Sequence, residues 1–226
     1  MNKPQEAFAP DQRQIKQLRN LVANGESATL EFKRKAAFPE KIIREMIAFA
    51  NTKGGILLVG IADDGGIPGL KYPEDDSHVI RKALTQCKPP LPVKEMFIPI
   101  GDSRTVIQYE ISESTRKPHY LLNAEQQKES FVRVADKSIK ASREIREISR
   151  RALEKKDIRF QYGDHEKLLM QYLDEHKSIT LKKFCEVSGL KRFYASKKLV
   201  LLVLADVLRI APHEKGDIYT LAFGKN

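Results

Sequence analysis

The sequence has few cysteines, no long apolar run and no secretory signal. Cys87 and Cys185 lie far apart, and each falls inside an apolar helical pattern. This placement favours free thiols in a reducing compartment over a disulfide or a metal site. No apolar run approaches the roughly 18 residues that a membrane span requires, and residues 1–10 lack the basic start and apolar middle of a signal peptide. We therefore expect a cytoplasmic protein with no membrane partner.

The common catalytic signatures are also missing. The chain contains no GxxxxGK[ST] phosphate loop, and its glycines between residues 54 and 69 do not form GxGxxG. It has no HExxH or GxSxG motif and no cysteine–histidine pair. These absences argue against the usual nucleotide-dependent enzymes and hydrolases.

What the chain does have is positive charge. The formal net charge is +10 over 226 residues, and it is spread along the chain, with no tail holding the excess. A spread positive field favours a nucleic acid or an acidic membrane surface as partner. Taken alone, it is equally compatible with a soluble protein of basic isoelectric point.

The stretch from residue 25 to residue 69 reads as strand, helix, buried strand and turn. In residues 29–33 the side chains alternate, so Glu31 and Lys33 share the polar face of a short strand. Pro39 suits the first turn of a helix, and the apolar run 56–62 is long enough for a strand buried on both faces. If the two strands pair, Glu26, Glu31, Lys33 and Asp63 converge on one patch.

Several sequence blocks of this region resemble the Schlafen AlbA-like (AlbA_2) domain family. They are Glu26-Ser27-x-x-Leu30-Glu31-Phe32-Lys33, Ala48-Phe49-Ala50-Asn51-Thr52-x-Gly54-Gly55 and Leu58-x-Gly60-Ile61-x-Asp63, with a weaker block in Lys117-Pro118-His119-Tyr120 and Phe131-Val132-Arg133-Val134. The resemblance covers roughly residues 14–150. It implies an α/β (α+β) domain, with a mixed sheet and helices, that presents a basic face to nucleic acid.

The resemblance also implies a possible metal site. In the nuclease-active Schlafens two glutamates and an aspartate hold a divalent metal for RNA cleavage, and Glu26, Glu31 and Asp63 fall on those positions. Mg²⁺ or Mn²⁺ would suit these oxygen ligands, and Lys33 would hold the scissile phosphate. The plainer alternative is an ionic pair of Glu31 with Lys33 and a turn at Asp63. The Schlafen groove is built from two related lobes and this chain has one, so we expect a homodimer.

The pattern restarts near residues 157–163, which predicts a tail at 1–12, an AlbA-like domain at 13–158 and a second domain at 159–226. The second domain carries helical patterns at 165–176, from Thr180, and at 191–204, followed by strands at 207–211 and 218–222. This order is typical of a winged helix-turn-helix.

In that arrangement the third helix enters the major groove with its first residues nearest the bases. The predicted nucleic-acid contacts on this helix are Lys191, Arg192, Tyr194, Lys197 and Lys198, and those elsewhere are Lys33, Arg34, Lys117, Arg133, Lys137, Lys140 and Arg143. We expect a DNA-binding transcriptional regulator, with DNA favoured over RNA and no cofactor needed for binding. The alternatives are a metal-dependent endoribonuclease and a protein-interaction module.

Overall fold

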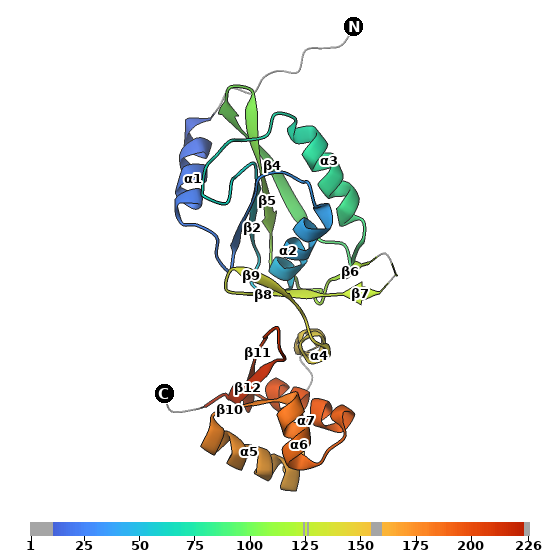
Figure 1. Cartoon of the computed structure of the whole chain (residues 1–226). Coiled ribbons are helices and arrows are strands. Elements are labelled where there is room, and N and C mark those ends of the chain that lie inside the picture. Colours follow the sequence, from blue (N-terminus) through green and yellow to red (C-terminus); the bar gives the residue numbers. More distant parts are fainter. Residues whose placement is uncertain (1–10, 124, 126, 155–159, 224–226) are drawn as a thin grey trace. The chain divides into compact units, whose positions relative to one another are not determined.

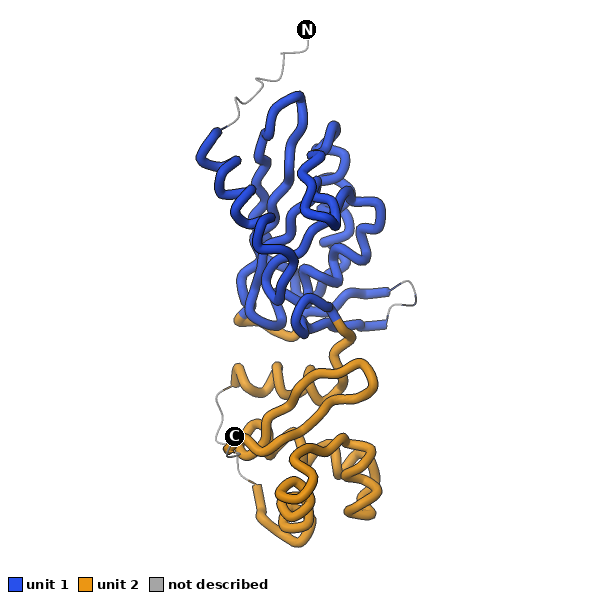
Figure 2. The backbone as a smooth tube through the Cα atoms, turned by 60° about the vertical axis from the view of Figure 1, so that its left-hand side comes forward, with its two compact units in different colours: residues 1–114, 119–138 blue, residues 115–118, 139–226 orange. Residues whose placement is uncertain are grey.

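The computed structural model describes residues 11–123, 125, 127–154 and 160–223. The chain splits into two compact units (Figure 2): a first unit of residues 1–114 and 119–138, and a second unit of residues 115–118 and 139–226. The predicted tail of residues 1–12 lies mostly outside the described residues, and the boundary predicted between residues 158 and 159 lies wholly outside them. The change of unit falls between Ser138 and Ile139, because helix α4 (Arg143–Ala152) packs against α7 (Arg192–Leu204) of the second unit.

The predicted α/β class is confirmed. The described residues of the first unit contain a four-stranded mixed sheet of order β1-β2-β5-β4, shown with its helices in Figure 1. Its strands are β1 (Leu30–Lys33), β2 (Gly55–Val59), β4 (Val93–Gly101) and β5 (Arg104–Ile111). β1 runs parallel to β2 with Leu30 opposite Ile56, and the other pairs are antiparallel. The predicted pairing of the first two strands is therefore present.

Helices cover both faces of this sheet. Successive side chains of a strand point to opposite faces, so the apolar side chains on each face pack against helices. The helices are α1 (Gln12–Ala23), α2 (Pro39–Asn51) and α3 (Pro73–Leu84). Leu58 packs with Leu18 and Val22 of α1, whereas Leu57 packs with Ile43 of α2. The apolar run 56–62 thus feeds two cores. Glu31 and Lys33 fall on the α2 side, since Leu30 and Phe32 face α1.

The shorter strands of this region lie at the lower end of the first unit in Figure 1. β3 (Cys87–Lys88), β6 (Tyr120–Leu122) and β7 (Lys128–Glu129) form one small antiparallel sheet, and β8 (Phe131–Val134) pairs with β9 (Lys137–Lys140). β8 packs against α2. This contact carries Arg133 of β8 to the polar side chains of β1.

The second unit contains the three predicted helices and the hairpin, and adds one strand. Its elements after α4 are α5 (Asp164–His176), β10 (Ser178–Thr180), α6 (Leu181–Ser188), α7, β11 (Leu208–Ala211) and β12 (Ile218–Leu221). β12 lies between β10 and β11 in an antiparallel sheet. As expected, Thr180 caps α6, since its hydroxyl accepts from the Lys183 N–H at 3.2 Å. The core of this unit includes Leu169, Phe184 and Leu199.

Both cysteines are free thiols, as predicted: Cys87 is buried and Cys185 is half-buried. Among the described residues, no helix has both the length and the apolar character to cross a membrane.

Candidate functional site

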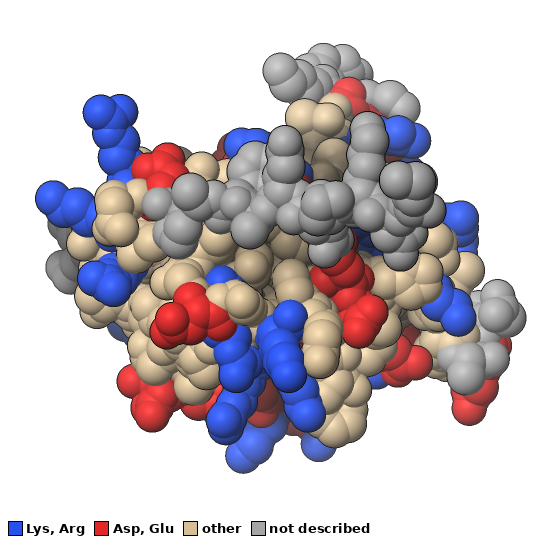
Figure 3. Space-filling model, turned by 90° about the horizontal axis from the view of Figure 1, so that it is seen from above, with Lys and Arg blue, Asp and Glu red and all other residues tan. Residues whose placement is uncertain are grey.

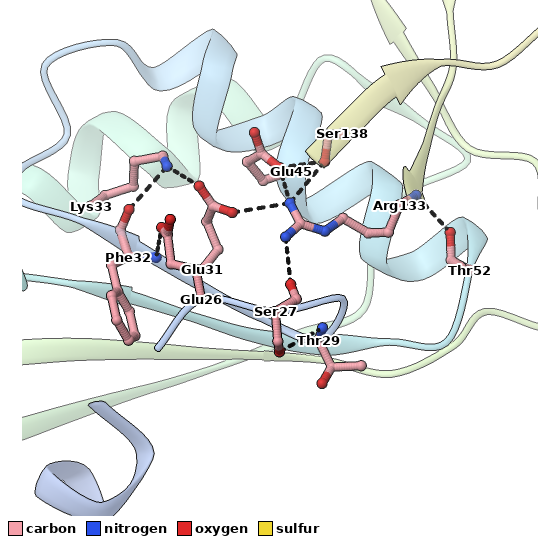
Figure 4. Close-up of polar contacts among 10 residues, drawn as sticks. All are labelled: Glu26, Ser27, Thr29, Glu31, Phe32, Lys33, Glu45, Thr52, Arg133 and Ser138. Carbon is pink, nitrogen blue, oxygen red and sulfur yellow. Dashed lines mark hydrogen bonds and ion pairs between the residues drawn. The ribbon is translucent and has the colours of Figure 1, made fainter. Parts of the chain in front are cut away.

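A chain of charged side chains links β1, α2 and β8 in the first unit (Figure 4). The ammonium of Lys33 contacts the Glu31 carboxylate and lies 2.9 Å from the carbonyl oxygen of Phe32. The other Glu31 oxygen is 3.0 Å from Nη1 of Arg133, and the same Nη1 lies 2.6 Å from Glu45. Both oxygens of Glu31 are therefore bound by cations.

Arg133 is the centre of this network and is wholly buried, with 0% of its side chain exposed. Its Nη2 donates to the carbonyl of Ser27 at 2.6 Å, and its guanidinium lies 4.8 Å from the ring centroid of Phe49. Its backbone N–H donates to the Thr52 hydroxyl at 3.0 Å. Because its side chain is buried, Arg133 does not reach the phosphate groups of a nucleic acid at the surface. The prediction that Arg133 binds nucleic acid is therefore wrong.

Glu45 belongs to the network although we did not predict it from the sequence. Burial raises the pKa of Glu45 above its ordinary value, the hydrogen bond from Ser138 opposes this, and the nearby charge of Glu31 adds to it. Two carboxylates thus share one buried guanidinium. The only sequence signal was an acidic residue off the apolar stripe of a helix, which is ordinarily a solvated position.

The predicted metal ligands do not form a metal site in this arrangement. One oxygen of Glu26 accepts the backbone N–H of Phe32 at 2.9 Å, and Glu31 is held by Lys33 and Arg133. Asp63 lies in an exposed turn. Within the described ranges, no group of three or more histidine, cysteine, aspartate or glutamate residues could hold a metal ion. The donor set therefore does not fit Mg²⁺ or Mn²⁺.

A second polar network explains why the AlbA-like blocks contain an asparagine and a histidine. Nδ2 of Asn51 donates to the carbonyl oxygens of His119 at 3.2 Å and Phe131 at 3.0 Å, and its Oδ1 accepts the His119 N–H at 2.8 Å. These bonds hold the end of α2 to the start of β6 and to β8. All three residues are buried, so their part is structural.

His119 also pairs with a serine in a geometry that resembles a catalytic dyad. Its Nδ1 lies 2.8 Å from the Pro89 carbonyl, which can only accept, so Nδ1 carries the proton and Nε2 accepts from the Ser114 hydroxyl at 2.7 Å. His119 is 0% exposed and Ser114 is 7% exposed. Both side chains are buried, so the pair is part of the packing of the first unit.

In the second unit, the start of α7 is the most open cationic segment of the predicted set. Lys191, Arg192, Phe193 and Tyr194 are all exposed. Lys191 makes no side-chain capping bond, and the first turn holds no acidic residue. The Phe193 and Tyr194 rings lie 5.5 Å apart and nearly perpendicular. Phe193 was not predicted, although cations next to aromatic residues in KRFY are a recognisable nucleic-acid signal.

α4 lies along the side of α7 that points away from the core. Ala195, Leu199 and Leu202 face the core, whereas Phe193, Ser196, Lys197 and Val200 line a groove against α4. With 3.6 residues per turn, these two sets lie on roughly opposite sides of the helix. The Ser196 hydroxyl donates to Glu144 of α4. α4 thus covers one side of α7, whereas Lys191, Arg192 and Tyr194 at the start of the helix are exposed, so the contact of these first residues with bases stays a prediction.

Lys198 has a structural partner instead of an open surface. Its Nζ lies 2.6 Å from Glu166, which is buried at the start of α5 and also accepts the Gly163 N–H at 3.1 Å. Burial of Glu166 disfavours its charged form, but the bonds from Lys198 and Gly163 outweigh this and hold its pKa below the ordinary value.

The remaining predicted cations are accessible to different degrees. Arg34, Lys137, Lys140, Arg143 and Lys197 are exposed, whereas Lys33 and Lys117 are half-buried. On the face of the molecule seen in Figure 3, basic and acidic side chains are interspersed. The net charge is therefore not gathered into one basic patch on that face.

Comparisons with known proteins place the first unit in a family. Comparison with curated protein sequences gave no significant match. The crystal structure of the DIP2311 protein from Corynebacterium diphtheriae is similar with a TM-score of 0.44 and 16% identity, over 93% of this chain and 38% of that one. The chain thus spans less than half the length of that protein. The Schlafen, AlbA_2 family model matches residues 26–142, just over half of the chain, and suggests a nucleic-acid-binding domain. The chain therefore belongs to the Schlafen AlbA_2 family.

Proposed function

We propose that the protein is a DNA-binding transcriptional regulator whose second unit is a winged helix that contacts nucleic acid. The family suggests a nucleic-acid-binding domain in the first unit. The order α5, β10, α6, α7, β11, β12, with β12 between β10 and β11, supports a winged helix for the second.

The observation that carries this proposal is the uncapped, cationic start of α7. The positive end of the helix dipole repels Lys191 and Arg192, and neither has an acidic neighbour in the first turn. A phosphate group at this end of the helix would relieve the repulsion and receive charge-assisted hydrogen bonds. Binding of this kind is largely electrostatic and weakens steeply with salt.

The ribonuclease alternative has no comparable support. It requires Glu31 to offer an oxygen to a metal ion, and both Glu31 oxygens are held by Lys33 and Arg133. The homodimer stays a prediction from the resemblance, and sedimentation of the purified chain would measure it.

Fluorescence anisotropy with labelled duplex DNA tests the proposal. The double variant Lys191→Ala/Arg192→Ala should lower the affinity at least about tenfold and reduce the slope of log affinity against log salt by about 1.8, since each phosphate contact contributes about 0.9. Lys16→Ala/Arg19→Ala removes the same two charge types from exposed positions on α1 and serves as the matched control. No DNA binding by the unaltered protein at low salt, or equal losses in both double variants, would contradict the proposal.

A further inference from the structure

The groove between α4 and α7 has its own shape and charge. It encloses about 210 Å³ within the second unit, and α4 forms one wall and α7 the other. The lining residues are Arg143, Glu144, Glu147, Arg151, Phe193, Ser196, Lys197 and Val200.

The two carboxylates of the groove lining, Glu144 and Glu147, each have a hydrogen-bond partner. Glu144 is buried and accepts the Ser196 hydroxyl, and Glu147 is bound by Arg150, which lies 2.8 Å away. The other charged residues of the lining are Arg143, Arg151 and Lys197. The groove lining therefore carries three cations against two carboxylates, and Lys191 and Arg192 add positive charge at the open end of α7.

Two exposed aromatic rings stand at the same end. Phe193 is 55% exposed and Tyr194 is 56% exposed, which is unusual for side chains of this size. The guanidinium of Arg143 lies 5.7 Å from the ring centroid of Phe193, so a cation and a ring are presented together. Aromatic rings on which bases stack, next to cations that follow the backbone, are typical of surfaces that bind single-stranded nucleic acid.

The packing of α4 keeps the major groove of a duplex away from the side of α7 that lines the groove, and leaves the start of α7 open. The major groove of B-DNA is about 12 Å wide and admits one α-helix. Two helices packed side by side have axes about 8–10 Å apart and are together much wider than that groove. A single strand needs no such width, and its unpaired bases are free to stack.

We infer that the α4–α7 groove binds single-stranded nucleic acid. Arg143, Arg151 and Lys197 contact phosphates, and a base stacks on Phe193, the aromatic residue of the groove lining, while Tyr194 lies beside it outside the groove. This inference rests on the proposed function, in which Lys191 and Arg192 at the start of α7 contact DNA, and adds a single strand as the ligand of the adjoining groove.

Competition between a strand and a duplex tests this inference. A labelled oligothymidine is titrated with the full-length protein, and a duplex hairpin with the same number of phosphates is titrated in parallel. We expect the strand to bind at least about tenfold more tightly, and Arg151→Gln/Lys197→Gln to lower the salt slope for the strand by about 1.4, at about 0.7 per phosphate.

Variants at Phe193 separate stacking from packing. Phe193→Leu keeps an apolar side chain but removes the ring, and should weaken strand binding about tenfold, whereas Phe193→Trp should retain it. Phe38→Ala is the matched control, since Phe38 of the first unit is 67% exposed and also carries a cation, Lys41, 4.9 Å from its ring centroid. Thermal unfolding of each variant confirms that it is folded.

The outcomes distinguish this inference from the proposed function. If the unaltered protein binds neither strand nor duplex at low salt, the proposed function fails and the inference fails with it. If the duplex binds as tightly as the strand, or if Phe193→Leu binds the strand like the unaltered protein, the inference is overturned while nucleic-acid binding stands.

Discussion

Arg133 on β8 donates to Glu45 on α2 over 2.6 Å, although 88 residues separate them in the chain. The same Nη1 reaches Glu31 on β1 at 3.0 Å, across 102 residues. One buried cation thus joins three elements that carry the family blocks. Since the side chain of Arg133 is fully buried and Glu31 is buried beside it, the cost of removing Arg133 is large.

Arg133→Met should lower the free energy of unfolding of the first unit by about 3–5 kcal/mol, because the buried Glu31 and the half-buried Glu45 lose the cation that they share. Urea denaturation followed by circular dichroism measures the change. Arg34→Met is the control: it removes an exposed arginine next to Lys33 and should change the free energy of unfolding by less than about 0.5 kcal/mol. Equal unfolding midpoints for the two variants would contradict the structural role of Arg133.

The raised pKa of Glu45 predicts how the stability of the first unit depends on pH. Its folded pKa is raised, chiefly by burial, above its ordinary value of 4.5, so between these two values the folded state binds more protons than the unfolded state. The stability penalty from Glu45 is therefore full above the folded pKa and is relieved as the pH falls to about 4.5.

Glu45→Gln removes this titration and keeps a side chain that can accept from Arg133. The difference in unfolding free energy, variant minus unaltered protein, should shrink as the pH is lowered from neutral toward 4.5, because protonated Glu45 is also neutral. Thermal unfolding of both proteins across this range measures it. A difference that stays constant or grows on acidification would show that Glu45 is not held above its ordinary pKa.

Gly54 is required for a close backbone approach as well as for its conformation. Its φ is +75°, and a Cβ there would lie 2.7 Å from the Ile111 carbonyl oxygen and 2.8 Å from the Glu113 nitrogen. Gly25 has a similar φ of +69° with nothing within 4 Å of such a Cβ.

Gly54→Ala should therefore cost clearly more than Gly25→Ala. The Gly25 variant meets only the left-handed penalty of about 1–2 kcal/mol, and the Gly54 variant adds about 1–3 kcal/mol of overpacking. Unfolding free energies from urea denaturation compare them, and similar losses in the two variants would contradict the close approach at Gly54.

Much of this fold follows from local patterns. The alternation in residues 29–33 predicts β1, and the stripe of Ile42, Ile43, Met46 and Ile47 predicts the buried face of α2, where all four are at most 1% exposed. Asp11 and Ser142, residue types that favour the N-cap position, cap α1 and α4 by accepting backbone N–H groups at 2.9 Å and 3.0 Å. These signals are local in the chain, so a single sequence contains them.

Apart from the pairing of β1 with β2, contacts between distant residues were not predicted. Asp76 and Ser77 lie within α3, where Asp76 accepts the backbone N–H of Ala36 and Ser77 donates to Glu95, and neither contact has a local signal. The roles of Arg133 and Lys198 were likewise missed, since each looks like a surface cation until its buried partner is located. The position of α4 on α7 depends on tertiary packing alone.

Variants of the adjacent residues Lys197 and Lys198 should separate effects on nucleic-acid binding from effects on stability. Lys198→Met removes the partner of buried Glu166 and should cost about 1–2 kcal/mol of stability in the second unit, with little effect on nucleic-acid affinity. Lys197→Met should weaken nucleic-acid binding and leave stability nearly unchanged.

Thermal unfolding and anisotropy titration of both variants give the comparison. The reverse result, in which Lys198→Met weakens binding at full stability, would place Lys198 on the nucleic-acid surface and contradict the ion pair with Glu166.

Photo-cross-linking tests the location of the nucleic-acid surface most directly. A strand containing 4-thiothymidine is irradiated with the full-length protein, which is then digested with trypsin, and mass spectrometry identifies the peptides that carry the adduct. Cleavage after Arg192 and Lys197 isolates the peptide of residues 193–197, which holds both exposed rings. We expect the adduct on this peptide, and adducts confined to peptides from residues 11–138 would contradict a nucleic-acid surface at the start of α7.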